Sequence, residues 1–112
     1  MKTNWSDEVD FALTLCDTEG KIVHMNEVSK ETFIKYGGKE LDGQSLFDCH
    51  PEPAATLLAS MLSSQERNVY TIEKNGRKKL IYQCPWYEKG IYMGFAELSF
   101  VLPDNMPHYI RK

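Results

Sequence analysis

The sequence has few cysteines, no long apolar run and no excess of positive charge, and each lack disfavours a class of protein. Its 112 residues include three cysteines, an odd number that argues against a scaffold of paired disulfides. The first residues lack the apolar run of a secretory signal, so a reduced, cytoplasmic protein is expected. No stretch approaches the roughly 20 apolar residues that a membrane-spanning helix needs.

The charge balance argues against a nucleic-acid partner. The formal net charge is −3, from 13 basic and 16 acidic residues, whereas nucleic-acid binders usually carry a basic stripe. The densest basic stretch, Arg77-Lys78-Lys79, is balanced by Glu73 and Glu88 and is expected to be a solvated hairpin end. With 42% hydrophobic and 26% charged residues, the chain has the composition of one globular domain.

Hydrophobic periodicity and turn residues predict five strands and two main helices. Residues 1–10 form a lead-in, residues 11–101 a single domain and residues 102–112 a tail. Strand-like patterns occur at residues 11–16, 21–25, 68–74, 77–86 and 91–102, and helical spacing at residues 26–37 and 53–65. Antiparallel strands of this kind need one face covered, and the helices are available to cover it. The predicted fold is therefore α+β, with helices packed on one face of a five-stranded antiparallel sheet.

Short polar motifs predict how these elements are joined. Asn26 lies between a strand pattern and a helical pattern, and its side chain can accept from the free amides of the first helical turn. We therefore predict that Asn26 caps the helix that follows it. Asp17-Thr18-Glu19-Gly20, Asn75-Gly76 and Glu88-Lys89-Gly90 predict tight turns between strands.

The order of these motifs resembles the PAS family. The matching residues are Asp17-Thr18-Glu19-Gly20-Lys21-Ile22-Val23 with Asn26, then Ser29, Phe33 and Tyr36-Gly37-Gly38-Lys39-Glu40-Leu41, then Gly43-Gln44-Ser45-Leu46. Each motif is weak alone, but their order is similar to PAS domains over about residues 11–101, and Cys49-His50-Pro51 is similar to a corner of some bacterial members. The resemblance implies a sensor domain with the first hairpin in mid-sheet and a tendency to form homodimers.

The resemblance also implies that a ligand, if there is one, lies between the inner sheet face and the helices within residues 26–65. Strands project alternate residues to each face, so only every second strand residue can reach such a ligand. A one-residue bulge would reverse which residues those are. The predicted ligand-binding residues are Phe33, His50, Leu57, Met61, Tyr82 and Phe95.

Other chemistry has candidates among the cysteines and histidines. Cys49 and His50 are adjacent, but neighbours in an extended segment point apart, so a thiol enzyme is disfavoured and no catalysis is expected. Haem ligation by histidine occurs in the PAS family, which leaves His24 and His50 as candidate ligands. Flavin is disfavoured because the residues around Cys49 lack the asparagine-cysteine-arginine motif of light-sensing members. Zinc is disfavoured because no Cys-x-x-Cys pair exists.

Two functions therefore stay open from the sequence, and the cofactor is not identified. The chain is either a sensing module that binds a small ligand or a signalling protein and transmits by a conformational shift, or an interaction module that homodimerises without a ligand. Strand-spaced aromatic residues suit sheet packing, a pocket or a dimer face. These residues are Tyr70, Tyr82, Trp86, Tyr92, Phe95 and Phe100.

Overall fold

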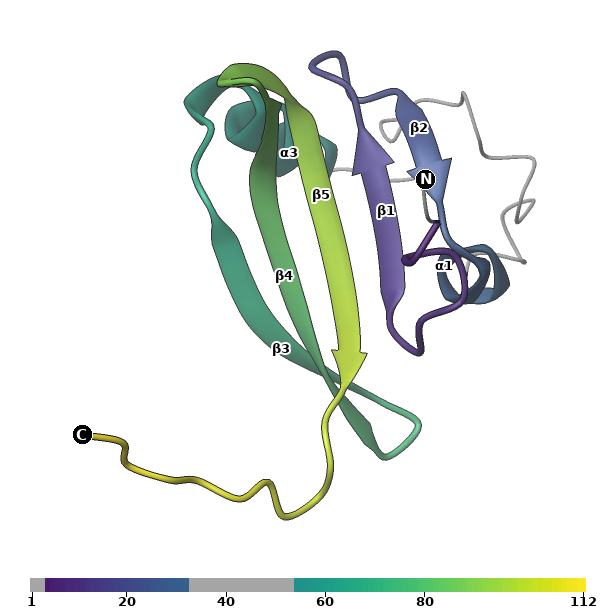
Figure 1. Cartoon of the computed structure of the whole chain (residues 1–112), viewed down its shortest axis with the longest axis vertical. Helices are drawn as coiled ribbons and strands as arrows, with labels where there is room; N and C mark the ends of the chain where they lie inside the picture. Colours follow the sequence, from purple (N-terminus) through teal and green to yellow (C-terminus); the bar gives the residue numbers. More distant parts are fainter. Residues whose placement is uncertain (1–3, 33–53) are drawn as a thin grey trace.

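The computed structural model describes residues 4–32 and 54–112 and contains a five-stranded antiparallel sheet (Figure 1). Its elements are β1 (Ala12–Cys16), β2 (Ile22–Met25), α1 (Glu27–Thr32), α3 (Ala54–Ser64), β3 (Asn68–Lys74), β4 (Arg77–Glu88) and β5 (Ile91–Val101). The predicted α+β class is confirmed, and each predicted strand is present within two residues of its expected ends. The predicted helix from residue 26 is described only as far as Thr32.

The strand order is β2-β1-β5-β4-β3, and all neighbouring strands are antiparallel. β5 lies at the centre because it pairs with β1 along one side and with β4 along the other (Figure 1). The first hairpin, β1–β2, therefore forms one flank of the sheet, with the four-residue β2 at the edge. The expectation that this hairpin lies in mid-sheet is wrong, because the last strand takes that place.

The predicted turns form where short-range signals are strong. The Asp17 carboxylate accepts from the backbone N–H groups of Glu19 and Lys21, each at 2.9 Å, which closes the first hairpin. Asn75 and Gly76 have φ values of 54° and 75°, the left-handed pair that a two-residue turn between twisted strands requires. The turn residues thus fix both hairpin ends from local sequence alone.

Asn26 joins β2 to α1 and uses the full hydrogen-bonding capacity of its buried side-chain amide. Its Oδ1 accepts from the backbone N–H groups of Ser29 and Leu13, each at 3.0 Å. Its Nδ2 donates to the carbonyl oxygens of Ser6 at 2.9 Å and Phe11 at 2.8 Å. The predicted helix cap is confirmed, and the same side chain also holds the N-terminal segment and β1.

The core lies between the sheet and α3, which is seen behind β4 and β5 in Figure 1. We call the sheet face toward α3 the inner face and the opposite face the outer face. The Tyr92 hydroxyl donates to the carbonyl oxygen of Leu62 at 2.9 Å and ties β5 to the end of α3. The core cluster consists of Cys16, Leu58, Met61, Leu62 and Phe95.

A bulge in the β4–β5 ladder decides which residues of β4 face the helices. Tyr87 pairs with Tyr92, but Trp86 pairs with Gly94, so β5 contributes one extra residue, Met93. Gly94 has a φ of 141°, and a Cβ at this position would overlap the carbonyl oxygen of Cys16. The bulge therefore depends on glycine, because the backbone of Cys16 and Asp17 occupies the space that a side chain at this position would need.

Candidate functional site

The strand register places one residue from each strand in a single row across the inner face. Thr14 of β1 pairs with Met25 of β2 on one side and with Glu97 of β5 on the other. Glu97 pairs with Gln83 of β4, and Gln83 pairs with Asn68 of β3. Directly paired residues project to the same face of a sheet. We call the four polar members, Thr14, Glu97, Gln83 and Asn68, the polar row.

Hydrogen bonds run along the polar row. Asn68 Nδ2 donates to Gln83 Oε1 at 2.9 Å, and Gln83 Nε2 donates to Glu97 Oε2 at 2.8 Å. At the other end the hydroxyls of Thr14 and Ser29 of α1 are hydrogen-bonded to each other. Thr14 and Ser29 are buried, whereas the other three members are half-buried. The row therefore combines internal hydrogen bonding with partial access from outside.

The polar row lies beside the apolar core under α3. Glu97 is two residues from Phe95, and strand residues two apart share a face. Phe95 and Met61 pack in the core at 4% and 8% exposure. On the far side of the row lies a second set of inner-face residues, Ala12, Ser99, Ile81 and Tyr70. The polar row is thus a stripe on the inner face, with Cys16 and Phe95 on its α3 side and the buried Ala12 and Ile81 on its far side.

The Tyr70 phenol responds to the charge of this row. Partial burial raises its pKa, and the negative charge of Glu97 raises it further, while a hydrogen bond with Gln83 lowers it. The net shift is upward, so the Tyr70 hydroxyl keeps its proton at neutral pH. The phenol is therefore a neutral group near enough to Glu97 for this carboxylate to raise the pKa of Tyr70.

The predicted ligand-binding residues are only partly brought together. Phe95 and Met61 lie on the inner side, where both belong to the core cluster. Phe33 and His50 lie outside the described residues, as does the side chain of Leu57 in α3. Ligand contact by these five residues stays a prediction.

Tyr82 lies on the outer face, and its expected place beside Phe95 in a pocket is corrected. An unbroken ladder from the β4–β5 turn would pair Tyr82 with Glu97, on the same face as Phe95. The bulge shifts this pairing by one residue, so Tyr82 pairs with Leu98. Its ring instead lies near Arg67, whose guanidinium donates to the Tyr82 hydroxyl at 3.2 Å.

Sequence reasoning missed the polar row as a unit. Its four members come from four strands, and nothing in the sequence pairs Asn68 with Gln83 or Gln83 with Glu97 before the register is known. The one local signal is Glu97, the single charged residue of β5, which shares the parity of Phe95. A charged residue on the core-facing parity of a central strand is unusual enough to mark the position.

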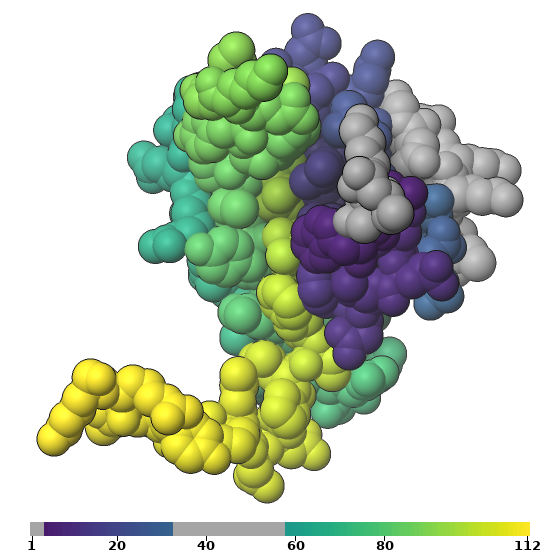
Figure 2. All heavy atoms as spheres, in the orientation of Figure 1, coloured from purple at the N-terminus to yellow at the C-terminus, as the bar shows by residue number. Residues whose placement is uncertain are grey.

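The outer face carries a second set of apolar side chains, of which Leu13 and Ala96 are buried and the others half-buried. The rings of Phe11 and Phe100 pack with centroids 5.0 Å apart, and the Trp86 indole donates to the carbonyl oxygen of Cys16 at 3.1 Å. Figure 2 shows this side of the molecule, where β4 and β5 are visible and α3 does not cover them. The apolar residues of this face are Phe11, Leu13, Leu15, Leu80, Tyr82, Trp86, Ala96, Leu98 and Phe100.

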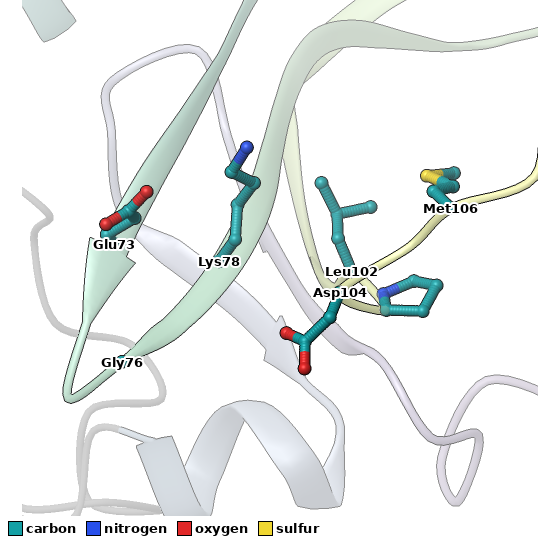
Figure 3. A pocket seen from close by; sticks show the side chains of 7 residues that line it. Glu73, Gly76, Lys78, Leu102, Asp104 and Met106 are labelled. Atoms are coloured by element: carbon teal, nitrogen blue, oxygen red, sulfur yellow. The ribbon is translucent and has the colours of Figure 1, made fainter.

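A separate hollow of about 290 Å³ lies at the opposite end of the sheet, between the β3–β4 turn and the start of the tail. Figure 3 shows that its polar side chains do not converge, because Asp104 points away from Lys78. Met106, which lines the hollow, is exposed, as are Tyr109 and Ile110 further along the tail. This hollow shares no residue with the polar row and offers no focused set of ligand-binding groups.

The described cysteines and histidines do not form a reactive or metal-binding group. Burial raises the pKa of the Cys16 thiol and of the Cys84 thiol, which disfavours the nucleophilic thiolate at both. His24 pairs with Leu15 in the ladder, which places it on the face opposite the polar row, and its Nε2 lies 3.6 Å from Asp7 Oδ1. Within residues 4–32 and 54–112, no three potential metal ligands gather. Cys49 and His50 lie outside these ranges.

Comparison with solved structures identifies the fold. The PAS domain of BvgS from Bordetella pertussis matches with a TM-score of 0.66 at 14% identity, over 89% of this chain and 82% of that chain. A sensory box sensor histidine kinase from Vibrio cholerae matches with a TM-score of 0.64 at 17% identity, over 88% and 87%. The Aer2 receptor from Vibrio cholerae, a dual PAS-heme oxygen sensor, matches with a TM-score of 0.61 at 16% identity, over 83% and 95%.

The chain therefore has the fold of PAS domains, as its motifs led us to expect. No protein-family model and no curated protein matches its sequence. Among the helices described, none has the length and apolar character that crossing a membrane would require.

Proposed function

We propose that the chain is a PAS-type signal-sensing module that binds a small ligand against the inner face of its sheet. The observation that carries this proposal is the polar row beside the core under α3. Half-buried polar side chains beside an apolar core reduce folding stability relative to apolar ones, a pattern found at sites kept for binding. A ligand that contacts both the sheet and the helices would favour one arrangement of the domain over another, which is a population shift.

The proposed ligand lies over the polar row and is bordered on the core side by Phe95 and Met61. Phe33, His50 and Leu57 stay predicted contacts from the segment that connects the sheet's two halves. The module is proposed to be non-catalytic and cytoplasmic, and to pass its signal to a protein partner. Both thiols described are in environments that disfavour the thiolate, which supports a binding role over a thiol enzyme.

An absorption spectrum of protein purified from its own host tests for a coloured ligand. A Soret band would identify haem, as in the Aer2 receptor, and would direct attention to His50, because His24 lies on the opposite face. A flavin band would identify flavin. A blank spectrum leads to thermal-shift measurements with a metabolite panel, where a ligand at 100 times its dissociation constant adds about 2.7 kcal/mol of stability. No shift with any compound, and no bound compound in native mass spectrometry, would contradict ligand sensing.

A second proposed role is homodimerisation through the outer face. The supporting observation is the set of aromatic and aliphatic side chains on the outer face of β1, β5 and β4, most of them half-buried, where α3 does not cover the sheet. Sedimentation at concentrations on the order of tens of micromolar should give a dimer, as weak interfaces of standard size do. Tyr82→Asp should shift the protein to monomer, whereas Lys89→Asp, at the exposed β4–β5 turn, should leave the dimer intact. A monomeric wild type would remove this role.

A further inference from the structure

The polar row interrupts an inner face that is apolar on either side of it, at Cys16 and Phe95 toward α3 and at Ala12 and Ile81 on the far side. Beneath helices an antiparallel sheet usually presents apolar side chains, and the neighbouring positions occupied by Cys16 and Phe95 do so. One strand step away, four strands each contribute a polar side chain to the same row. A polar residue at the same row position on four separate strands indicates a shared role for these side chains, such as binding, that folding alone does not require.

The direction of the hydrogen bonds within the row determines which donor and acceptor atoms remain available to a ligand. The Gln83 amide is used at both ends, because it accepts from Asn68 and donates to Glu97. The chain of donors therefore ends on the Glu97 carboxylate, which has a second oxygen and further lone pairs available. At its other end, Asn68 keeps its Oδ1 as an acceptor. Both ends of the chain thus present acceptors.

The charge of the row is negative. Within residues 4–32 and 54–112, the ion pairs are His24–Asp7 and Lys30–Glu27, and neither involves Glu97. Gln83 is the hydrogen-bond donor that the described residues supply to this carboxylate. A half-buried carboxylate held by one neutral donor favours a further donor, and a positively charged one above all.

We propose that the ligand presents a positively charged or donor-rich nitrogen group, such as an amidinium, guanidinium or ammonium, to the Glu97 carboxylate. This inference rests on the proposed ligand-sensing function and specifies its chemistry. The apolar body of the ligand lies toward Phe95, where the face becomes apolar. Carboxylates and phosphates are disfavoured, because they would bring a second negative charge beside Glu97, which forms no ion pair within residues 4–32 and 54–112, and the inner-face Lys79 lies two rows away along β4.

Three small molecules that share one ring and differ in head group test this proposal. Benzamidine carries a planar cation, benzamide a neutral amide and benzoate an anion. Titration followed by amide NMR should give binding in the order benzamidine, then benzamide, with no saturable binding of benzoate. Intermolecular contacts should connect benzamidine protons with the side-chain amide of Gln83. Equal binding of benzoate, absent contacts with Gln83, or no binding of benzamidine would each overturn the proposal.

A matched pair of variants locates the interaction. Glu97→Gln keeps the shape of the side chain and an oxygen that can accept from Gln83, and should weaken benzamidine binding at least about tenfold, equivalent to about 1.4 kcal/mol. Glu73→Gln removes an equal charge from an exposed position of β3 and should leave binding unchanged. Equal affinity in wild type and Glu97→Gln would overturn the proposal.

The metabolite panel separates this inference from the function on which it rests. An anionic metabolite that binds the wild type and shifts signals of the polar row would support ligand sensing and overturn the proposed ligand chemistry. A cationic or amine-bearing metabolite whose binding is lost in Glu97→Gln would support both.

Discussion

Each face of the sheet carries one set of side chains that its surroundings do not favour, although the inner face is otherwise apolar at Cys16, Phe95, Ala12 and Ile81. The inner face, next to helix α3, has a row of hydrogen-bonding side chains. The outer face, where α3 does not pack, has aromatic and aliphatic ones. A domain selected only to fold would place apolar groups under its helices and polar groups toward water. We infer that each face is adapted to a contact beyond the domain's own core, with a polar ligand on one side and a protein surface on the other.

The assignment of residues to the two faces depends on the bulge at Met93, so the largest effect should come from Gly94. Gly94→Val places side-chain atoms where the Cys16 carbonyl and Asp17 backbone lie, and its φ of 141° is unfavourable for any residue with a Cβ. We expect a loss of about 4 kcal/mol or more in unfolding free energy, or no folded protein. Urea denaturation followed by circular dichroism measures this.

Gly90→Val is the matched control, because Gly90 also has a positive φ, 81°, but a Cβ there meets no atom within 4 Å. Its cost should be limited to the turn's backbone strain, of order 1–2 kcal/mol. Equal costs at Gly94 and Gly90 would show that close approach of β5 to β1 does not depend on glycine.

Asn26 tests how the helix on the inner side is coupled to the rest of the domain. Asn26→Ala removes four hydrogen bonds and leaves buried backbone groups of Leu13 and Ser29 without their acceptor. We expect a loss of about 2–3 kcal/mol, more than the roughly 1 kcal/mol of a simple helix cap. Thermal or urea unfolding provides the measurement.

Asn26→Asp separates the two halves of this role. Aspartate keeps an oxygen for the amides of Leu13 and Ser29, but it cannot donate to the carbonyls of Ser6 and Phe11. Hydrogen exchange should remain slow in α1 and become faster in the N-terminal segment. Uniform faster exchange in both regions would contradict this division.

If the polar row is kept for a ligand, a single substitution in it should lower the free energy of unfolding, whereas a combined apolar substitution should not. Gln83→Leu deprives Asn68 and Glu97 of their partner, and should destabilise by about 1–2 kcal/mol. Asn68, Gln83 and Glu97 are the three members joined by hydrogen bonds. Replacing them together, as Asn68→Val, Gln83→Leu and Glu97→Val, removes these polar groups at once and should restore or exceed wild-type stability. The triple variant should also lose ligand binding. A triple variant less stable than Gln83→Leu would show that the row is kept for folding, not for a ligand.

The sequence predicted features that depend on neighbouring residues and failed where distant strands decide. The Asn26 cap and the Asn75–Gly76 turn need only a few adjacent side chains, so both were predictable. The face of Tyr82 depends on a bulge that appears only once β4 pairs with β5, and a shift of one residue exchanges the faces of the whole strand. The polar row was out of reach for the same reason, because its members meet only through the register of four strands.

The smallest expected effect is a difference in labelling rate between two cysteines, one on each face of the sheet. Cys16 on the inner side is 1% exposed, whereas Cys84, paired with Ala96 on the outer face, is half-buried. Both thiols have a raised pKa with burial as the first cause, so labelling by iodoacetamide at neutral pH should be slow at both and slower at Cys16. Mass spectrometry of the labelled peptides measures the two rates.

The raised pKa of Cys16 also predicts the direction of a pH effect. Its ordinary value is 9.0, and burial, with the nearby charges of Asp17 and Glu97, raises the pKa in the folded state. The stability that this neutral thiol contributes is therefore fully present below pH 9.0 and is lost as the pH rises through the folded-state pKa. The melting temperature of the wild type should fall more steeply above pH 9.0 than that of Cys16→Ala. Cys84→Ala should behave more like the wild type, because burial raises the pKa of the Cys84 thiol while the charge of Arg67 lowers it. If Cys84→Ala and not Cys16→Ala flattened the profile, the deeper burial of the inner-face thiol would not be the source of the alkaline instability.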